Sequence, residues 1–357
     1  MTMDALHQSQ GAVLAADGIP LHYGDLKAEY HAALEQVVLM DRSHEGCIEN
    51  SGRDRLELIQ RISTNDVLHM SVGEGRPTLF TNPNGRIIDR LMIYDRDETA
   101  LITTEPGRSE AVKNYLQHQI FFRDDVRIRD LSSNSKLFTL HGPAADTVVQ
   151  LLTGATLQTT GFWVISATID SESILFAQRK ALCGGHWAVI APTHVAEMVW
   201  NSILEAGKTN QIRQAGSLTY NVLRIRAGRP AAGRELSQDY IPLEAGLWDE
   251  VSFKKGCYTG QEIIARMESR NRLAKTMVQI RLNQMVDAPA DLYFDNTIVG
   301  TLTSSVVSPD NEIFGIGFVK TNVAQTKQLL TVGAARIQAT ISALAGAQPP
   351  MLQQQND

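Results

Sequence analysis

Residues 252–266 carry the side chains with the clearest potential for chemistry. They read SFKKGCYTGQEIIAR and place Cys257 just after Lys254 and Lys255 and just before a predicted helix start at Gly260. Nearby cations and the positive end of a helix both favour a thiolate, which is the nucleophilic and metal-binding form of cysteine. The pattern therefore predicts a reactive cysteine. The alternative is a small cysteine buried in a tight loop, which is a common fate of a free thiol.

The residues that follow this cysteine predict the element that positions it. Thr259 and Glu262 have the spacing of a capping box, in which a hydroxyl and a carboxylate each accept a hydrogen bond from a free backbone N–H. Tyr258 precedes the cap and can pack against Ile263 as a hydrophobic staple. We therefore expect a helix to begin at Gly260. Its core-facing side chains would be Ile263, Ile264 and Met267.

The composition argues against two broad classes of partner. The chain has 357 residues, and 33 basic and 39 acidic side chains give a formal net charge of −6. Non-specific nucleic-acid binding needs a basic surface, so we expect no nucleic-acid partner. Apolar residues nowhere continue for about 18 positions, so we expect no membrane span. The first residues lack the basic stretch and apolar core of a secretory signal.

Three cysteines are spread widely along the chain. Cys47, Cys183 and Cys257 form no CxxC pair, and an odd number argues against a disulfide framework. This usage is typical of a reducing compartment, and we expect a cytoplasmic protein. His44 and His186 each lie three positions from a cysteine, but zinc binding would need both pairs to meet, so we predict no metal site. For Cys47 and Cys183 we expect a structural role.

Two successive stretches of the chain show the same order of predicted elements. Each reads as strand, helix, two strands, helix and strand, which is the order of a ferredoxin-like domain. The first starts near Gly46 and the second near Lys136, about 90 residues later. From Met277 onward, short alternating runs separated by turn residues favour a small β-barrel or sandwich. The expected fold class is α+β, with two ferredoxin-like βαββαβ domains and a C-terminal β-barrel.

These patterns predict six parts along the chain. They are an N-terminal lead-in over 1–36, a ferredoxin-like domain over 37–132, a second one with its linker over 133–250, the cysteine segment over 251–275, the barrel over 276–345 and a disordered tail over 346–357.

The sequence KKGCYTGQEIIAR resembles the signature of the YgfZ proteins, the folate-binding branch of the glycine cleavage T-protein superfamily, which supports iron–sulfur enzymes. The motif residues are Lys255, Gly256, Cys257, Tyr258, Gly260, Gln261 and Glu262. Further stretches resemble the T-protein pattern at 40–46, 52–54, 63–66, 78–82, 85–89, 223–228, 242–247 and 300–317. The resemblance covers about residues 37–340.

This resemblance implies a three-domain T-protein-like ring with tetrahydrofolate in its central hole and a folate-binding first domain. In T-proteins an aspartate at the position of Asp89 handles the reacting nitrogen of the folate. T-proteins usually carry two consecutive aspartates there, whereas this chain has Asp89 followed by Arg90. A second T-protein carboxylate, in a Gly-Tyr-Thr-Gly-Glu segment, has no counterpart in residues 183–187. Both departures weigh against aminomethyl transfer and leave folate binding open.

Three further residues are candidate folate contacts, each with a structural alternative. The resemblance makes Arg224 a candidate for the folate glutamate carboxylate, and the alternative is an ion pair with Glu235 or Glu244. Asn65 has groups that can recognise a pterin, yet asparagine is also a common turn residue. Trp187 offers a flat surface for stacking, although a tryptophan in an apolar strand more often belongs to the core.

The sequence therefore predicts a tetrahydrofolate-binding protein of the YgfZ type that supports iron–sulfur cluster assembly or repair. Cys257 and Asp89 are the predicted reactive residues, and iron–sulfur enzymes or assembly proteins are the predicted partners. The first alternative is an aminomethyltransferase of the glycine cleavage system, which produces methylene-tetrahydrofolate. The second is a non-catalytic module that sequesters folate or recruits a partner.

Overall fold

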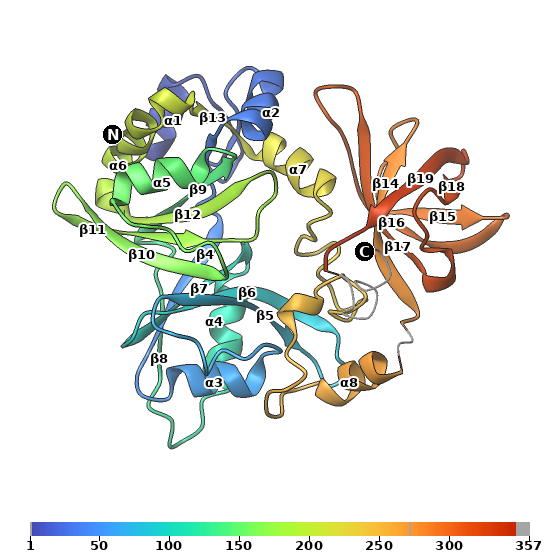
Figure 1. The fold of residues 1–357 in the computed structure, drawn as a ribbon, viewed down its shortest axis with the longest axis horizontal. Helices are drawn as coiled ribbons and strands as arrows, with labels where there is room; N and C mark the ends of the chain where they lie inside the picture. Colours follow the sequence, from blue (N-terminus) through green and yellow to red (C-terminus); the bar gives the residue numbers. More distant parts are fainter. Residues whose placement is uncertain (1, 271–272, 348–357) are drawn as a thin grey trace. The chain divides into compact units, whose positions relative to one another are not determined.

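The computed structural model describes residues 2–270 and 273–347, and the chain divides into two units (Figure 1). The first unit comprises the chain up to residue 59 together with 67–77 and 91–223. The second comprises 60–66, 78–90 and the chain from 224 onward. The chain passes from one unit to the other within helix α3 (Arg55–Ile62) and strands β5 (Glu74–Thr81) and β6 (Ile87–Asp95).

The first unit is built on a mixed sheet in which the strands follow the order β13-β3-β9-β12-β11-β10-β5-β6-β7-β4-β8. The strands not yet defined are β3 (Val38–Asp41), β4 (Glu45–Ser51), β7 (Thr99–Pro106), β8 (Arg127–Asp130), β9 (Ser135–Gly142), β10 (Phe162–Ile169), β11 (Glu172–Gln178), β12 (Gly185–Pro192) and β13 (Arg213–Gln214). Its helices include α4 (Ser109–His118), α5 (Ala145–Thr153) and α6 (Ala196–Ala206).

The two-copy repeat expected from the sequence is present in this sheet, with three strands rather than two between the helices of each copy. Strand β4 begins at Glu45 and β9 at Ser135, and each is followed by a helix, three strands and a second helix. In the first copy, β8 returns beside β4, with Ile48 opposite Asp130. The two copies join where β10 pairs with β5, with Phe162 opposite Gly75.

The second copy is completed by a strand that comes before it in the sequence. Strand β3 pairs with β9 in antiparallel register, with Leu39 opposite Leu140, and β13 then pairs with β3 in parallel. All four residues of β3 are buried, which makes this short strand suited to an interior position. The N-terminal segment also contributes α1 (Met3–Ser9) and α2 (Leu26–Glu35), which the sequence patterns did not reveal.

The core of the first unit lies between this sheet and its helices. Figure 1 shows α5 and α6 covering one face of the strands β9 to β12. Phe138, Trp187 and Trp200 are buried there, and Met3 and Leu6 of α1 belong to the same cluster. Burial of a large apolar side chain stabilises a fold by roughly 1.5–3 kcal/mol, so this cluster holds the helices on the sheet.

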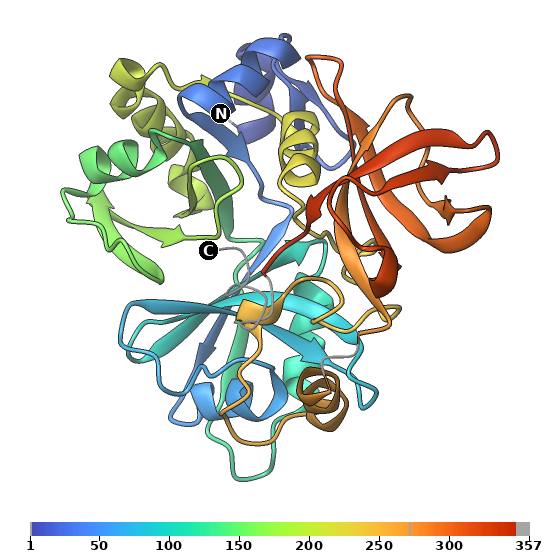
Figure 2. The ribbon, with the colours of Figure 1, turned by 45° about the vertical axis from the view of Figure 1, so that its right-hand side comes forward.

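The second unit contains a closed six-stranded barrel with the strand order β14-β17-β16-β15-β18-β19. In Figure 2 these strands are coloured orange to red. They are β14 (Lys275–Leu282), β15 (Ala290–Phe294), β16 (Thr297–Val307), β17 (Ile313–Lys320), β18 (Leu329–Val332) and β19 (Ile337–Leu344). The sequence patterns identified all but β19. Ile280, Leu302 and Ile341 are among the buried residues that fill the barrel.

A segment before the barrel completes the second unit. It contains η3 (Trp248–Glu250) and α8 (Gln261–Ser269), and α7 (Ser217–Arg226) leads into it. Trp248, Tyr258 and Ile264 belong to one buried apolar cluster, so η3 and α8 are fixed to each other through the loop that carries Tyr258.

No helix among residues 2–270 and 273–347 has the length and apolar character that crossing a membrane requires. The predicted disordered tail over 346–357 lies outside the described residues from 348 onward.

Candidate functional site

Cys257 lies on the loop that precedes α8, and its side chain is exposed. The next residue, Tyr258, is only 7% exposed and packs with Trp248 and Ile264. Burial raises the pKa of the Tyr258 hydroxyl to about 12. The alternative of a cysteine buried in a tight loop is therefore wrong, because the loop buries the tyrosine and leaves the thiol in solvent.

Lys255 fastens this loop to residues 60–65 of the same unit. Its ammonium donates to the backbone carbonyl oxygens of Gln60, Ser63 and Asn65 at 2.5, 2.6 and 2.9 Å. Carbonyls in the last turn of a helix lack intrahelical partners, and α3 ends at Ile62, so a cation is well suited to this place. Burial lowers the pKa of Lys255 to about 8, against the opposing charge of Asp66.

The sequence suggested that Lys255 would stabilise a thiolate on Cys257, and the structure gives this lysine a different role. An ammonium group has three N–H donors, and three carbonyl oxygens accept them. Lys255 therefore positions the loop rather than contacting the sulfur. Lys254, three residues before the cysteine, is exposed.

The predicted capping box is also absent. Helix α8 runs from Gln261 to Ser269, and its N-cap is Gly260, with a φ of 84° and no side-chain cap. A Cβ atom at Gly260 would lie 2.5 Å from the carbonyl oxygen of Asn82, so only glycine fits this close approach. The carbonyl of Thr259 accepts a hydrogen bond from the Thr81 hydroxyl at 2.6 Å. The loop is thus held by tertiary contacts, and Ile264 is the fully buried residue of the helix.

Asp89 lies in β6 and is 4% exposed. The following Arg90 forms a two-point contact with the carboxylate of Glu250 in η3, with N–O distances of 2.7 and 2.6 Å. Glu250 is fully buried. Such paired hydrogen bonds between a guanidinium and a carboxylate are among the strongest polar contacts in proteins. The cation that follows Asp89 is therefore neutralised by a residue 160 positions away, which no local sequence signal reveals.

Arg224 takes the structural alternative that the sequence left open. Its guanidinium lies 3.5 Å from the Glu235 carboxylate and donates to the Ser304 hydroxyl at 3.2 Å. Glu235 also accepts hydrogen bonds from Thr303 and Ser304, at 2.6 and 2.7 Å. Glu244, the other partner considered, lies 3.4 Å from Arg86. Arg224 therefore ties the end of α7 to the barrel within the second unit.

Asn65 and Trp187 have protein partners that account for them. The Asn65 side-chain oxygen accepts from the next backbone N–H at 2.9 Å, which is a turn role, and its amide donates to the Asp249 carbonyl at 3.4 Å. Trp187, in the first unit, is 1% exposed, and its indole N–H donates to Asp146 at 2.7 Å. Trp187 is therefore a core residue.

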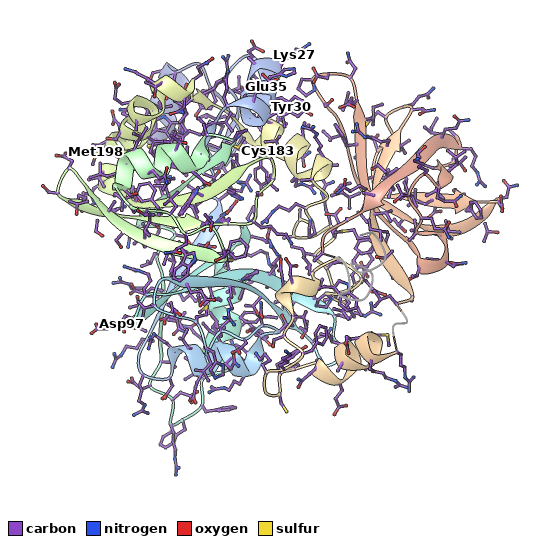
Figure 3. The ribbon with its side chains drawn as sticks, in the orientation of Figure 1. Lys27, Tyr30, Glu35, Asp97, Cys183 and Met198 are labelled. Carbon is purple, nitrogen blue, oxygen red and sulfur yellow. The ribbon has the colours of Figure 1, made fainter. Side chains whose placement is uncertain are left out.

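The other two cysteines occupy different environments. Cys47 is buried, and this burial raises the pKa of its thiol to about 12. Cys183 is half-buried on the loop between β11 and β12 (Figure 3). No group of three His, Cys, Asp or Glu side chains in the described ranges 2–270 and 273–347 is arranged to hold a metal ion.

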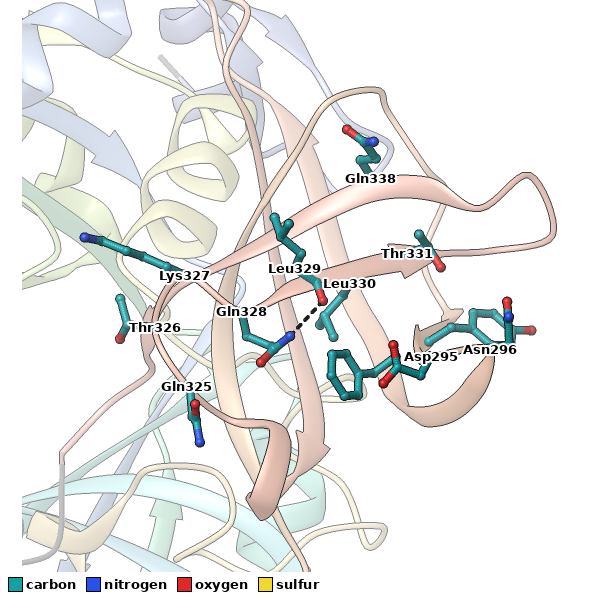
Figure 4. Close-up of a pocket in the computed structure, with 12 residues that line it drawn as sticks. Asp295, Asn296, Gln325, Thr326, Lys327, Gln328, Leu329, Leu330, Thr331 and Gln338 are labelled. Atoms are coloured by element: carbon teal, nitrogen blue, oxygen red, sulfur yellow. Dashed lines mark hydrogen bonds between the residues drawn. The ribbon is translucent and has the colours of Figure 1, made fainter.

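The barrel carries a hollow of about 730 Å³ on its surface (Figure 4). Its lining includes the Asp295–Asn296 turn, Leu329 and several amide side chains, and Gln328 donates to the Leu329 carbonyl at 3.1 Å. None of the residues predicted from the sequence lines this hollow. The second unit does bring together the cysteine loop, Asn65, Arg90 and Glu250 through hydrogen bonds that involve residues 60–66 and η3.

Comparisons with known proteins agree with this architecture. Residues 4–255 match the model of the GCVT N-terminal domain. A chloroplastic protein of Arabidopsis thaliana named "Putative transferase" is 30% identical over 340 residues, which cover 93% of this chain and 76% of that protein. The aminomethyltransferase of Halalkalibacterium halodurans is 27% identical over 313 residues, covering 86% of this chain and 85% of the relative.

The fold has a solved counterpart. The crystal structure of the glycine cleavage system aminomethyltransferase T from Bartonella henselae matches with a TM-score of 0.83 and 19% identity, covering 95% of both chains. At that identity the match establishes the fold, and it confirms the predicted α+β class with its C-terminal barrel. Because the family model covers more than half of the sequence, the chain belongs to the GCVT N-terminal domain family.

Proposed function

We propose that this protein is a cytoplasmic tetrahydrofolate-binding member of its family, of the YgfZ type, that supports iron–sulfur cluster assembly or repair. The observation that carries the proposal is the exposed thiol of Cys257 on a loop anchored from both sides. Lys255 fixes the loop through three carbonyls, and Tyr258 fixes it through the apolar cluster. A cysteine with only a structural role does not require contacts that fix an exposed loop, whereas a reacting thiol benefits from a fixed position.

Asp89 is the residue that best fits a folate contact. Its carboxylate is nearly buried, and a carboxylate accepts hydrogen bonds from N–H groups such as those of a reduced pterin. Tetrahydrofolate, when bound, would supply the nitrogen that carries a one-carbon group. Asp89 would orient that nitrogen and stabilise positive charge on it.

Cys257 can supply one ligand or one reacting sulfur. Clusters held by cysteine usually take four thiolates, so a contact with an iron–sulfur cluster requires the remaining ligands from a partner protein. Exposure of the thiol is compatible with such a partner, since the sulfur needs no rearrangement of the loop to be reached. The proposed partners are therefore iron–sulfur enzymes or the proteins that assemble their clusters.

The role of Cys257 is tested in a strain whose iron–sulfur enzymes depend on this protein. Cys257→Ser is expected to abolish support of those enzymes while the protein remains folded, because the substitution removes only an exposed sulfur. Cys183→Ser is the matched control, since it changes a second accessible thiol on another loop. Full iron–sulfur enzyme activity with Cys257→Ser would remove the proposed role.

A second candidate function is aminomethyl transfer. It is favoured by relatives at 26–27% identity that are named aminomethyltransferase. The Arg90–Glu250 pair also neutralises the cation beside Asp89, which removes one objection to chemistry at that carboxylate. Formation of methylene-tetrahydrofolate from an aminomethylated lipoyl carrier measures this activity directly. Turnover that is lost in Asp89→Asn and unchanged in Cys257→Ser would establish aminomethyl transfer in place of our proposal.

A further inference from the structure

A second cluster of buried charges lies in the first unit. Glu45, at the start of β4, accepts a hydrogen bond from Nε of Arg42 through Oε1 at 2.8 Å, and Nη2 of the same arginine lies 2.8 Å from this oxygen. Its other oxygen, Oε2, lies 2.5 Å from Nη1 of Arg179, the residue that follows β11. The three side chains are 5%, 5% and 8% exposed in the order Arg42, Glu45 and Arg179. One carboxylate thus serves two guanidinium groups.

This cluster has an excess of positive charge. Two cations share one anion, and Glu45 is the acidic partner of both arginines in the part of the chain that the structure describes. Buried charges are normally paired, because an uncompensated charge in a low-dielectric interior is strongly unfavourable. The guanidinium of Arg42 also stacks on the Tyr220 ring at 3.6 Å, which accommodates part of its charge. Arg179 has no comparable stacking partner within residues 2–270 and 273–347.

The hydrogen-bonding capacity of Arg179 is also incomplete. Its Nη1 contacts Glu45, whereas Nε and Nη2 are buried and have no hydrogen-bond partner among residues 2–270 and 273–347. These two atoms form the edge of a guanidinium that presents two parallel N–H donors, the geometry that matches the two oxygens of a carboxylate. A buried donor without an acceptor is unfavourable, and here two such donors lie on one edge.

The second unit contains a buried arginine whose Nε and Nη2 donors both have acceptors. In Arg90 the Nε and Nη2 edge is occupied by both oxygens of Glu250. Arg90 therefore shows what the corresponding edge of Arg179 lacks, namely a planar carboxylate. The segment beside Arg179 is the loop 179–184 between β11 and β12, in which Ala181 is exposed and Cys183 half-buried. This loop is the segment next to Arg179 that has residues in contact with solvent.

We propose that the open Nε and Nη2 edge of Arg179 binds the carboxylate group of a small organic acid. The acid supplies the missing negative charge and two acceptor oxygens, so that Arg179 is paired on both edges as buried arginines usually are. Because both nitrogen atoms are shielded from solvent, the occupant is small, and it enters by displacement of the loop 179–184. The site lies within the first unit.

Nuclear magnetic resonance of the arginine Nε–H groups tests this site in the full-length protein. Formate and acetate are titrated at constant ionic strength against chloride, and the Arg179 resonance is assigned by its loss in Arg179→Lys. We expect a saturable shift of the Arg179 Nε–H signal with either acid. The Arg90 signal in the same spectra is the internal control and should not move, because its edge is filled.

Thermal unfolding supplies a second measurement with variants. Stabilisation by formate or acetate should require about tenfold more acid in Arg179→Lys, which keeps the charge and loses the two-donor edge. Arg90→Lys should keep the wild-type dependence.

An Arg179 signal that never responds to either acid would mean that the edge holds water only, and would overturn the proposal. An equal response to chloride would also overturn it, since a halide site needs no paired oxygens. If Arg179→Lys does not fold, the Arg179 Nε–H signal is assigned by through-bond correlation to its own backbone amide, and the wild-type titration then decides.

Discussion

Two buried arginines, Arg90 in the second unit and Arg179 in the first, differ in how completely they are paired. Arg90 has its own carboxylate, Glu250, which occupies both donors of one edge. Arg179 shares Glu45 with Arg42, and in the described part of the chain the corresponding edge has no partner. The complete pair is a structural element, and we propose that the incomplete one binds a ligand. Both arginines are buried and charged, so these two properties do not distinguish them. The number of acceptor oxygens that contact each guanidinium does distinguish them.

The largest effect is expected from removal of the shared carboxylate. Glu45→Gln leaves two buried guanidinium groups without an anion, which should lower the free energy of unfolding by about 5 kcal/mol, the upper end for breaking a buried ion pair. Denaturant unfolding at neutral pH measures this loss. A loss below that of Glu250→Gln would contradict the view that Glu45 serves two cations.

Removal of the unshared carboxylate should have a smaller effect. Glu250→Gln removes the anionic partner of Arg90 only and should lower the free energy of unfolding by about 3 kcal/mol. Glu312→Gln is the control, because it breaks the exposed pair with Arg281, in which the side chains are 49% and 43% exposed. Exposed pairs contribute about 0–1 kcal/mol, so the control should be close to wild type. Similar losses of unfolding free energy in Glu250→Gln and Glu312→Gln would mean that the Arg90 pair is open to water.

Lys255 extends the comparison to a cation paired only with neutral groups. Lys255→Met keeps the length of the side chain but leaves the carbonyls of Gln60, Ser63 and Asn65 without their donor. Buried acceptors without partners cost about 1–3 kcal/mol, so we expect a loss of about 2 kcal/mol in denaturant unfolding. Lys254→Met changes the exposed neighbour and should be neutral. Equal effects of the two substitutions would show that Lys255 does not hold the loop.

The pH dependence of Lys255 has a definite sign. Burial lowers its pKa to about 8 in the folded protein, against an unperturbed value of 10.5. Between these two values the unfolded chain binds the proton and the folded protein does not, so folding is favoured as the pH rises. The wild-type free energy of unfolding should therefore increase relative to that of Lys255→Met from about pH 8 to pH 10.5. A relative decrease over this window would mean that the carbonyls raise the pKa instead.

The sequence was sufficient for those features that depend on local patterns. Alternation of apolar residues predicted five of the six barrel strands, and self-similarity about 90 residues apart predicted the repeat that begins at β4 and β9. The exposed position of Cys257 next to a buried tyrosine agrees with the motif that drew attention to it. Such features follow from periodicity and from turn residues, which short stretches of sequence contain.

Features that depend on distant partners could not be predicted. Glu250 lies 160 positions from Arg90, and the carbonyls bound by Lys255 lie at least 190 positions away. Thr259 and Glu262 satisfy the local rule for a capping box, yet the approach of Asn82 to Gly260 decides the actual start of α8. The order of predicted elements leads one to expect that the strand after α6 pairs with β9. In the structure the N-terminal strand β3 takes this place. Tertiary contacts decided each of these cases.

Calorimetric titration with tetrahydrofolate tests the central claim most directly. The wild-type protein should bind tetrahydrofolate, and Asp89→Asn should bind it at least about tenfold more weakly, because a hydrogen bond to a charged group contributes about 1.5–3 kcal/mol. Asp239→Asn, which changes an exposed carboxylate in the same unit, should bind like the wild type. Absence of binding by the wild-type protein, or equal affinity in Asp89→Asn, would contradict the account.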